Sequence, residues 1–253
     1  MIRILVSNDD GYNAEGILAL TAAMEPLGEV WVVAPESQQS AASHAISLHR
    51  PLRLRELGPR RFAVDGTPTD CSYLAINHLM RDARPTIAVS GINHGPNLAD
   101  DVTYSGTVAA AMEASILGIP AIAFSLATRQ DFEFDVAARF AREFVRAAVG
   151  QPLAPSMLLN VNVPAGSAIS EYRVTRLGKH SYGCDVVEKT DPRGRKYYWI
   201  GGSEYSHEDI PGSDCSAVYR EERISVTPLH LQLTDLGTID NVDHWPVAGF
   251  QKP

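Results

Sequence analysis

Apolar runs alternate with amphipathic segments over the first two thirds of the chain. Runs rich in β-branched residues have the length of buried strands and fall at 2–7, 30–34, 86–90, 121–125 and 157–161. Apolar positions between them recur at helical spacing, in segments at 17–27, 70–80, 106–117 and 136–149. Strand, helix and strand in succession are typical of right-handed βαβ units. The pattern therefore predicts an α/β core with a mostly parallel sheet at about 1–165.

The pattern changes after about residue 165. Helical periodicity is lost, and alternating segments at 195–200 and 217–227 predict hairpins with turns at 192–194 and 211–213. Shorter alternation at 46–64 predicts a small β-excursion, and Asp70 is a candidate helix cap. We interpret 1–253 as a single domain whose β-rich segment at 166–253 serves oligomer contacts.

Charge and cysteine content exclude several classes of protein. The 253 residues carry a formal net charge of -8 with a pI near 5.5, which argues against a nucleic-acid polymer as partner. The three cysteines are far apart and lack metal-ligand spacing, which indicates free thiols in a reducing compartment. We see no signal peptide, and no apolar stretch approaches the ~20 residues that span a bilayer. We therefore expect a cytoplasmic protein without a membrane partner.

Three polar loops follow predicted strands, at 8–13, 35–44 and 91–101. In open parallel sheets, ligands bind beyond the carboxyl ends of the strands, where the strand order reverses. We expect all three loops to open at that edge of the sheet and to form the functional site there.

Asp9 and Asp10 are the most informative pair in these loops. Adjacent ionised carboxylates repel each other, and a cation between them relieves this repulsion. The alternative is a solvent-exposed Asp-Gly turn, although this turn leads into a helix and not into a hairpin strand. Ser40 and Asn93 could complete a shell of oxygen ligands of the kind that Mg²⁺, Mn²⁺ or Ca²⁺ prefers over Zn²⁺. Taken singly, each of these two also fits an ordinary loop hydrogen-bonding residue.

The segments at 95–97 and 104–107 suggest a phosphate cradle. Ser105 or Thr107 can cap the Ala-rich helix, whose first N–H groups would point at a bound anion. An ordinary N-cap is the alternative. His94 adjoins this loop, and we predict it to be a surface-loop histidine. The chain has no Walker A sequence, no GxGxxG fingerprint and no GxSxG elbow.

Several of these motifs, taken in order, resemble those of the SurE (survival protein E) family. The resemblance covers nearly the whole chain, and Ala99 stands where family members often have Gly. It rests on segments 7–11, 14–17, 33–35, 65–71, 89–97, 104–108, 159–164 and 225–229.

The resemblance implies a Rossmann-like three-layer fold with C-terminal elements exchanged between subunits of a homodimer or homotetramer. It implies a phosphatase that uses one divalent metal ion per subunit, Mg²⁺ or Mn²⁺. Its substrates would be nucleoside 5′- and 3′-monophosphates, sometimes also short polyphosphate. By position, it assigns the metal ligands to Asp9, Asp10, Ser40 and Asn93, and the phosphate contacts to Asn97, Ser105, Gly106 and Thr107.

We favour a mechanism in which Asp10 orients or deprotonates the attacking water. A covalent role for Asp9 is the alternative, as in haloacid-dehalogenase-like phosphatases, but those enzymes use an Asp-x-Asp spacing that 8–10 does not provide. Two other functions fit the same fold. They are a non-catalytic, metal-dependent nucleotide-binding module and a glycosyltransferase-like enzyme with a metal-bound diphosphate.

Overall fold

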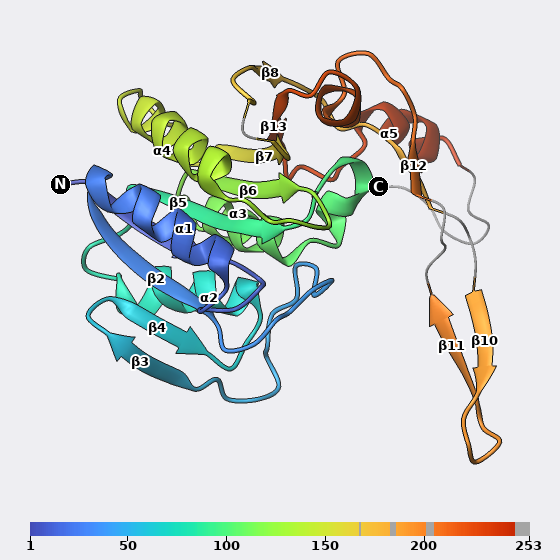
Figure 1. Cartoon of the computed structure of the whole chain (residues 1–253), viewed down its shortest axis with the longest axis horizontal. Coiled ribbons are helices and arrows are strands. Elements are labelled where there is room, and N and C mark those ends of the chain that lie inside the picture. Colours follow the sequence, from blue (N-terminus) through green and yellow to red (C-terminus); the bar gives the residue numbers. More distant parts are fainter. Residues whose placement is uncertain (167, 183–185, 201–204, 246–253) are drawn as a thin grey trace.

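The computed structural model describes residues 1–166, 168–182, 186–200 and 205–245. Its centre is a nine-stranded sheet in the order β3-β4-β2-β1-β5-β6-β7-β13-β8 (Figure 1). Neighbours from β4 to β7 pair in parallel, whereas β3 and β13 run antiparallel to β4 and β7. The strands are β1 (Arg3–Ser7), β2 (Glu29–Pro35), β3 (Leu54–Gly58), β4 (Arg61–Val64), β5 (Ile87–His94), β6 (Ala121–Ala127), β7 (Leu158–Pro164), β8 (Tyr172–Val174) and β13 (Ile224–Leu229).

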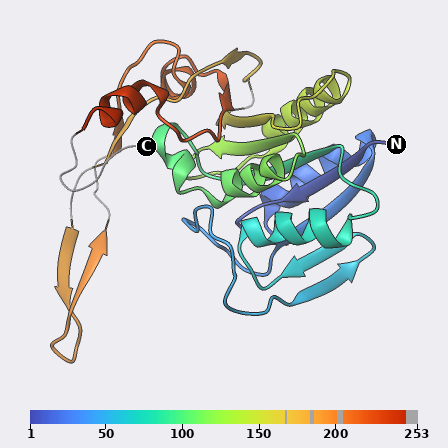
Figure 2. The ribbon, with the colours of Figure 1, turned by 180° about the vertical axis from the view of Figure 1, so that it is seen from behind.

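Helices cover both faces of the sheet, which makes three layers. Helices α1 (Glu15–Met24) and α4 (Asp135–Val149) pack together on one face. Helices α2 (Pro68–Leu74) and α3 (Gly106–Ile116) cover the other face, as Figure 2 shows from behind. The predicted α/β fold with a mostly parallel sheet is confirmed.

Strand β1 shows why the apolar runs were continuous and not alternating. Ile4 and Val6 pack into the core beneath α1, with Ile17. Leu5 points to the opposite face and joins the core beneath α2 and α3. Successive side chains of a strand point to opposite faces, so a strand covered on both sides needs apolar residues at every position.

The β-excursion predicted at 46–64 corresponds to β3 and β4 at the sheet edge. The predicted cap at Asp70 was placed three residues too late. The N-cap of α2 is Thr67, whose hydroxyl accepts a hydrogen bond from the Asp70 N–H, while the Asp70 carboxylate accepts one from the Thr67 N–H. This reciprocal pair is a capping box, in which the acidic residue belongs at the third helical position.

Two predictions for the last third of the chain were wrong. The turn at 211–213 leads into a short π-helical segment, η4 (Ser216–Arg220), and not into a hairpin strand. Helical structure also returns in α5 (Leu236–Asp243), capped by Asp235. Both segments are short, so their helical periodicity is weak in the sequence.

The hairpin predicted around 192–194 is present. It consists of β10 (Val186–Thr190) and β11 (Lys196–Ile200), whose residues are all exposed, and Figure 1 shows it extending away from the core. A second antiparallel pair is formed by β9 (His180–Tyr182) and β12 (Tyr205–His207).

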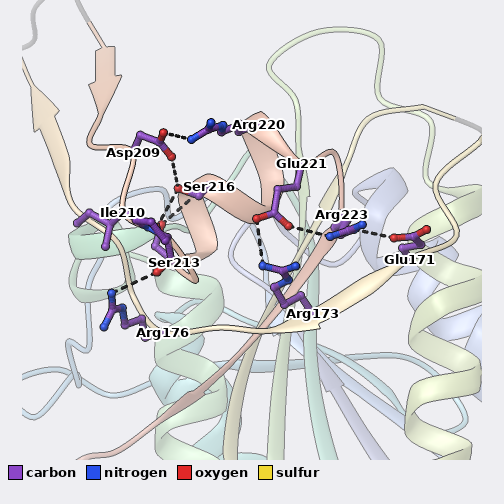
Figure 3. Close-up of polar contacts among 11 residues, drawn as sticks. Glu171, Arg173, Arg176, Asp209, Ile210, Ser213, Ser216, Arg220, Glu221 and Arg223 are labelled. Atoms are coloured by element: carbon purple, nitrogen blue, oxygen red, sulfur yellow. Dashed lines mark hydrogen bonds and ion pairs between the residues drawn. The ribbon is translucent and has the colours of Figure 1, made fainter.

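Ion pairs fix the segment around η4 and β13 to the edge of the sheet (Figure 3). Arg223 donates to Glu171 at 2.6 Å and to Glu221 at 3.0 Å, and Arg173 donates to the other oxygen of Glu221 at 3.1 Å. Beside them in Figure 3, the Ser216 hydroxyl donates to the Asp209 carboxylate at 3.0 Å. These contacts tie β8 to η4, so this part of the β-rich segment belongs to the body of the domain.

Cys71 and Cys215 are buried free thiols, and Cys184 lies outside the described residues. Among the helices described, none combines the length and the apolar character needed to cross a bilayer.

Candidate functional site

The sheet reverses its strand order beside β1. The chain passes from β1 to β2 on one side, and later enters β5 on the other side of β1. Asp9 and Asp10 follow the carboxyl end of β1, and Asn93 and His94 end β5 directly beside it. This is the crevice in which open α/β sheets bind ligands.

Hydrogen bonds join the three predicted loops to one another. The Gln39 N–H donates to the Asp9 carbonyl at 2.7 Å, and the His94 N–H donates to the Asp10 carboxylate at 3.2 Å. The loops enclose a cavity of about 280 Å³, and the predicted convergence is confirmed. The cavity is lined by Asp9, Asp10, Ser40, Ala41, Asn93, His94, Pro96, Asn97, Asp101, Tyr104 and Ser105.

Asp9 is a buried carboxylate, with 5% of its surface exposed. Burial and the neighbouring Asp10 charge raise its pKa to about 6, against the lowering effect of a hydrogen bond from the Thr107 hydroxyl. Burial penalises the charged form, and a bound cation would remove that penalty. The pair is therefore not a solvent-exposed Asp-Gly turn.

Asp10 is held by His94, which sequence reasoning had placed on the surface. The His94 imidazole Nδ1 lies 2.9 Å from Asp10 Oδ2, and the His94 N–H donates to the same oxygen at 3.2 Å. Its ring packs edge-on against Phe132 and Phe134, with centroids 4.9 Å away in both cases. The hydrogen bond to Asp10 raises the pKa of His94. The prediction of a surface histidine was wrong, and the adjacency of His94 to Asn93 was the available signal.

The other two candidate ligands also present oxygen atoms. Asn93 donates its amide N–H to the Gly95 carbonyl at 2.9 Å, which leaves its Oδ1 as an acceptor 3.2 Å from the Thr107 hydroxyl. Ser40 Oγ accepts a hydrogen bond from Gln38 at 2.9 Å. Within the described ranges, no cluster of three or more His, Cys, Asp or Glu side chains is placed to hold a metal. The candidate set thus has two carboxylates, one amide and one hydroxyl, which are hard oxygen donors that suit Mg²⁺ or Mn²⁺.

The N-terminus of α3 packs directly against Asp9. Ser105 is the N-cap, and its hydroxyl accepts a hydrogen bond from the Val108 N–H at 3.0 Å. A β-carbon on Gly106 would lie 2.7 Å from the Asp9 β-carbon, so only glycine allows this approach. Thr107 is buried behind Asp9 and contacts the site through its hydroxyl. Gly106 and Thr107 therefore place the helix N-terminus at the site without lining the cavity with side chains.

Comparisons with known proteins agree with this geometry. The family model described as "Survival protein SurE" matches residues 4–184. The chain belongs to the SurE family. It is 66% identical over 250 residues to a protein named 5′-nucleotidase SurE from Myxococcus xanthus (strain DK1622), covering 99% of this chain and 95% of that protein. A protein with the same name from Geobacter sulfurreducens is 50% identical over 250 residues, covering 98% and 95% of the two chains.

A solved SurE structure shows the same fold. The crystal structure of the Sure protein from Aquifex aeolicus superposes with a TM-score of 0.84 at 38% identity, covering 95% of this chain and 98% of that chain. The SurE resemblance stated from the motifs is confirmed. Ala99, which stands where SurE proteins often have Gly, has a φ of 50°, a left-handed conformation that favours glycine.

In this SurE-family chain, hydrogen bonds from buried side-chain amides hold the backbone at Asn97 in place. Asn162 on β7 accepts from the Asn97 N–H at 2.8 Å and donates to its carbonyl at 2.9 Å. Asn160 donates to the same carbonyl at 2.7 Å, and Asn97 donates its own side-chain amide to Ser125 at 2.8 Å. Sequence reasoning gave Asn160 and Asn162 no role. Two asparagines on one face of an otherwise apolar strand were the signal that could have indicated it.

Proposed function

We propose that this protein is a divalent-metal-dependent phosphatase that releases phosphate from nucleoside 5′-monophosphates. Nucleoside 3′-monophosphates and short polyphosphate belong to the same proposal, since each presents a terminal phosphoryl group. The observation that carries it is the buried Asp9 carboxylate beside Asp10 at the N-terminus of α3. The two relatives described above, named 5′-nucleotidase SurE, support the nucleotide as substrate.

The residues present fit a hard divalent cation. Asp9, Asp10, Ser40 and Asn93 would hold one Mg²⁺ or Mn²⁺ per subunit, and the pKa of Asp9, raised to about 6, indicates a buried charge that lacks compensation. A bound cation of this kind polarises a phosphoryl oxygen and lowers the pKa of a water molecule that it holds.

The chain itself supplies orientation and charge stabilisation. His94 fixes the Asp10 carboxylate through two hydrogen bonds, so Asp10 is our candidate to orient or deprotonate the attacking water. The first N–H groups of α3, at Gly106 and Thr107, would stabilise negative charge on the phosphoryl oxygens together with Ser105. Asn97, held rigidly by its buried network, would complete the phosphate contacts.

A covalent role for Asp9 has less support than the water mechanism. One of its oxygens accepts the hydrogen bond from Thr107, and its side chain is almost fully buried. A nucleophilic carboxylate must reach the phosphorus atom, whereas a carboxylate that holds a cation can stay in the wall of the cavity. Trapping an aspartyl-phosphate on Asp9 would contradict the water mechanism.

The decisive experiment is phosphate release from a panel of nucleoside monophosphates with Mg²⁺ or Mn²⁺. We expect turnover by the wild type that is abolished by EDTA and by Asp10→Asn. Asp100→Asn is the matched control, because Asp100 is an exposed carboxylate near the site that does not line the cavity. Equal loss in both variants would contradict the proposal.

Two other functions give different results in the same assay. Tight, metal-dependent binding of nucleotides without phosphate release would indicate a non-catalytic binding module. Activity confined to nucleotide sugars would indicate a glycosyltransferase-like enzyme. The paired carboxylates at a helix N-terminus favour phosphate-ester hydrolysis over both, because they place a cation and an anion site side by side.

We also propose that the protein acts as a homodimer or homotetramer in the cytoplasm. The hairpin β10–β11 exposes large apolar side chains, among them Trp199 at 63% and Ile200 at 91%, and α5 exposes Leu236 at 69%. Exposed apolar surface of this kind is typical of an interface between protein chains. The buried free thiols of Cys71 and Cys215 agree with a reducing compartment.

A further inference from the structure

A buried carboxylate on α3, that of Glu113, has no part in the mechanism above. Glu113 lies about two helical turns after Gly106, the residue at which α3 begins beside Asp9. Only 7% of its surface is exposed, and Ala110 and Ala111 beside it on the helix are buried as well. Burying a carboxylate costs free energy unless a hydrogen-bond donor compensates it. The donor for Glu113 comes from another segment of the chain.

That donor is His44, in the polar loop that follows β2. His44 Nε2 lies 2.8 Å from Glu113 Oε2 and forms a hydrogen bond with it. An ionised carboxylate accepts hydrogen bonds and donates none, so Nε2 carries the proton. The side chain of His44 keeps 32% of its surface exposed, whereas that of Glu113 keeps 9%. The pair therefore reaches from the surface to the buried part of α3 and ties the loop to the helix.

The same loop presents Ser40, a candidate cation ligand, in a tight turn. The Ala42 N–H donates to the Gln39 carbonyl at 3.1 Å and closes a β-turn, in which Ser40 and Ala41 are the central residues. Ala41 has a φ of 58°, a left-handed conformation that favours glycine. On the near side, the Gln39 N–H holds the turn to the Asp9 carbonyl. The turn is unfavourable for an alanine, so it also needs contacts on its far side.

Ser43 and His44 supply the contacts on the far side of the turn. Ser43 donates its N–H to the Tyr104 carbonyl at 3.1 Å and its hydroxyl to the Thr103 carbonyl at 2.7 Å. Ser43 itself has a φ of 53°, so this point of attachment is also unfavourable for its residue. His44 is the next residue, and its bond to Glu113 holds the chain in that conformation.

Other hydrogen bonds hold the chain after His44 independently. The Thr67 hydroxyl donates to the Ala45 carbonyl at 2.7 Å, and the Ser47 N–H donates to the Asp70 carboxylate at 2.8 Å. These bonds attach the segment after the loop to the first turn of α2. They do not depend on the His44 side chain, so its removal should release the loop and leave the rest of the fold in place.

We propose that His44 and Glu113 are positioning residues that hold the Ser40 turn at the cation site. His44 does not line the cavity itself, so it acts through the loop that carries Ser40. The inference rests on the proposed function for the cation. It predicts that a histidine outside the cavity controls the affinity of the protein for a divalent metal ion.

Calorimetric titration with Mn²⁺ tests the proposal. His44→Ala should weaken Mn²⁺ binding about 10-fold, the lower end of the range for residues that orient metal ligands. Ser40→Ala should also weaken it, and adding His44→Ala to Ser40→Ala should cause no further loss, because the histidine acts through Ser40. His44→Gln, whose side-chain N–H still donates to Glu113, should recover most of the affinity.

His49→Ala is the matched control, because His49 is an exposed histidine further along the chain that does not line the cavity. It should bind Mn²⁺ as the wild type does. Wild-type affinity in His44→Ala or in Ser40→Ala would overturn the proposal. Losses that add in the double variant would also overturn it, because His44 would then act independently of Ser40.

Hydrogen–deuterium exchange in EDTA observes the loop without any metal. The N–H groups of Gln39, Ala42 and Ser43 are hydrogen-bonded, so they should exchange slowly in the wild type. They should exchange faster in His44→Ala, whereas the N–H of Ser47, bonded to Asp70, should keep its rate. Unchanged exchange in the loop would overturn the proposal.

Phosphate release is measured separately, so the inference and the proposed function can fail independently. A wild type that binds Mn²⁺ but releases no phosphate would contradict the proposed function and leave the role of His44 intact. A wild type that releases phosphate, with unchanged Mn²⁺ affinity in His44→Ala, would overturn the inference alone. Thermal unfolding identifies any variant that fails to fold. Glu113→Gln, which keeps the shape of the side chain and removes its charge, then carries the test and should also weaken Mn²⁺ binding.

Discussion

The hydroxyl of Thr107 donates a hydrogen bond to the carboxylate of Asp9, and so joins two residues 98 positions apart in the sequence. The bond connects the first turn of α3 to the end of β1, where the strand order of the sheet reverses. It stabilises the ionised form of Asp9 against the burial that disfavours it. The same hydroxyl lies 3.2 Å from Asn93 Oδ1, so its one hydrogen can be shared between two candidate metal ligands.

Thr107→Val should weaken metal binding. Valine has nearly the same shape but donates no hydrogen bond, so Asp9 and Asn93 lose their common partner. Removing a group that orients metal ligands typically lowers metal affinity about 10- to 100-fold. Calorimetric titration with Mn²⁺ measures the change. Thr103→Val is the control, because the Thr103 hydroxyl only caps its own turn at the Asp100 carbonyl. Equal affinities of the wild type and Thr107→Val would contradict the prediction.

Metal-free protein should lose stability as the pH rises through the titration of Asp9. The pKa of Asp9 is raised from 3.8 to about 6 in the folded state. Between these values the folded protein keeps a proton that the unfolded chain has released, so the free energy of unfolding falls with increasing pH. Above about pH 6 the penalty is complete and amounts to at most about 3 kcal/mol.

Asp9→Asn removes this penalty. In EDTA above pH 6, the variant should be more stable than the wild type by up to about 3 kcal/mol, and the difference should vanish near pH 4. Urea denaturation at several pH values measures both curves. Saturating Mn²⁺ should reverse the order, because it stabilises only the wild type. Parallel stability curves in EDTA would show that Asp9 does not titrate as described.

Asn162→Ala should destabilise the fold and impair phosphate binding together. The substitution leaves the buried N–H of Asn97 without its acceptor, and an unsatisfied buried group costs about 1–3 kcal/mol. The Asn97 loop then loses its fixed position, so KM for AMP should rise. Urea denaturation and steady-state kinetics test the two effects. Gln151→Ala, at an exposed position after α4, should change neither. A destabilised variant with unchanged KM would show that the network stabilises the fold without affecting phosphate binding, and would contradict the prediction.

The exposed hairpin should determine the oligomeric state. Trp199→Glu combined with Ile200→Glu places charges on its apolar surface, and each apolar side chain withdrawn from an interface costs about 1.5–3 kcal/mol. Analytical ultracentrifugation should show a dimer or tetramer for the wild type and a smaller species for the variant. Lys189→Gln, an exposed substitution on the same hairpin, should keep the wild-type mass. A monomeric wild type would refute the assembly.

The sequence by itself determined the strands and helices of the core and the edge of the sheet at which the site lies. The continuous apolar run around Leu5 requires a strand covered on both faces, and a polar turn after such a strand lies at its carboxyl end. The candidate ligands Asp9, Asp10, Ser40 and Asn93 could therefore be proposed from local pattern, since each lies in a polar segment at or after the carboxyl end of a strand.

Only the tertiary structure decided how these residues interact. The bonds from His94 to Asp10, from Thr107 to Asp9 and from Asn162 to Asn97 join segments brought together by the strand order, and no local periodicity records such pairs. Hydrogen bonds between distant segments depend on where the sheet places those segments. Burial then determines which carboxylate has a raised pKa, because it disfavours the charged form.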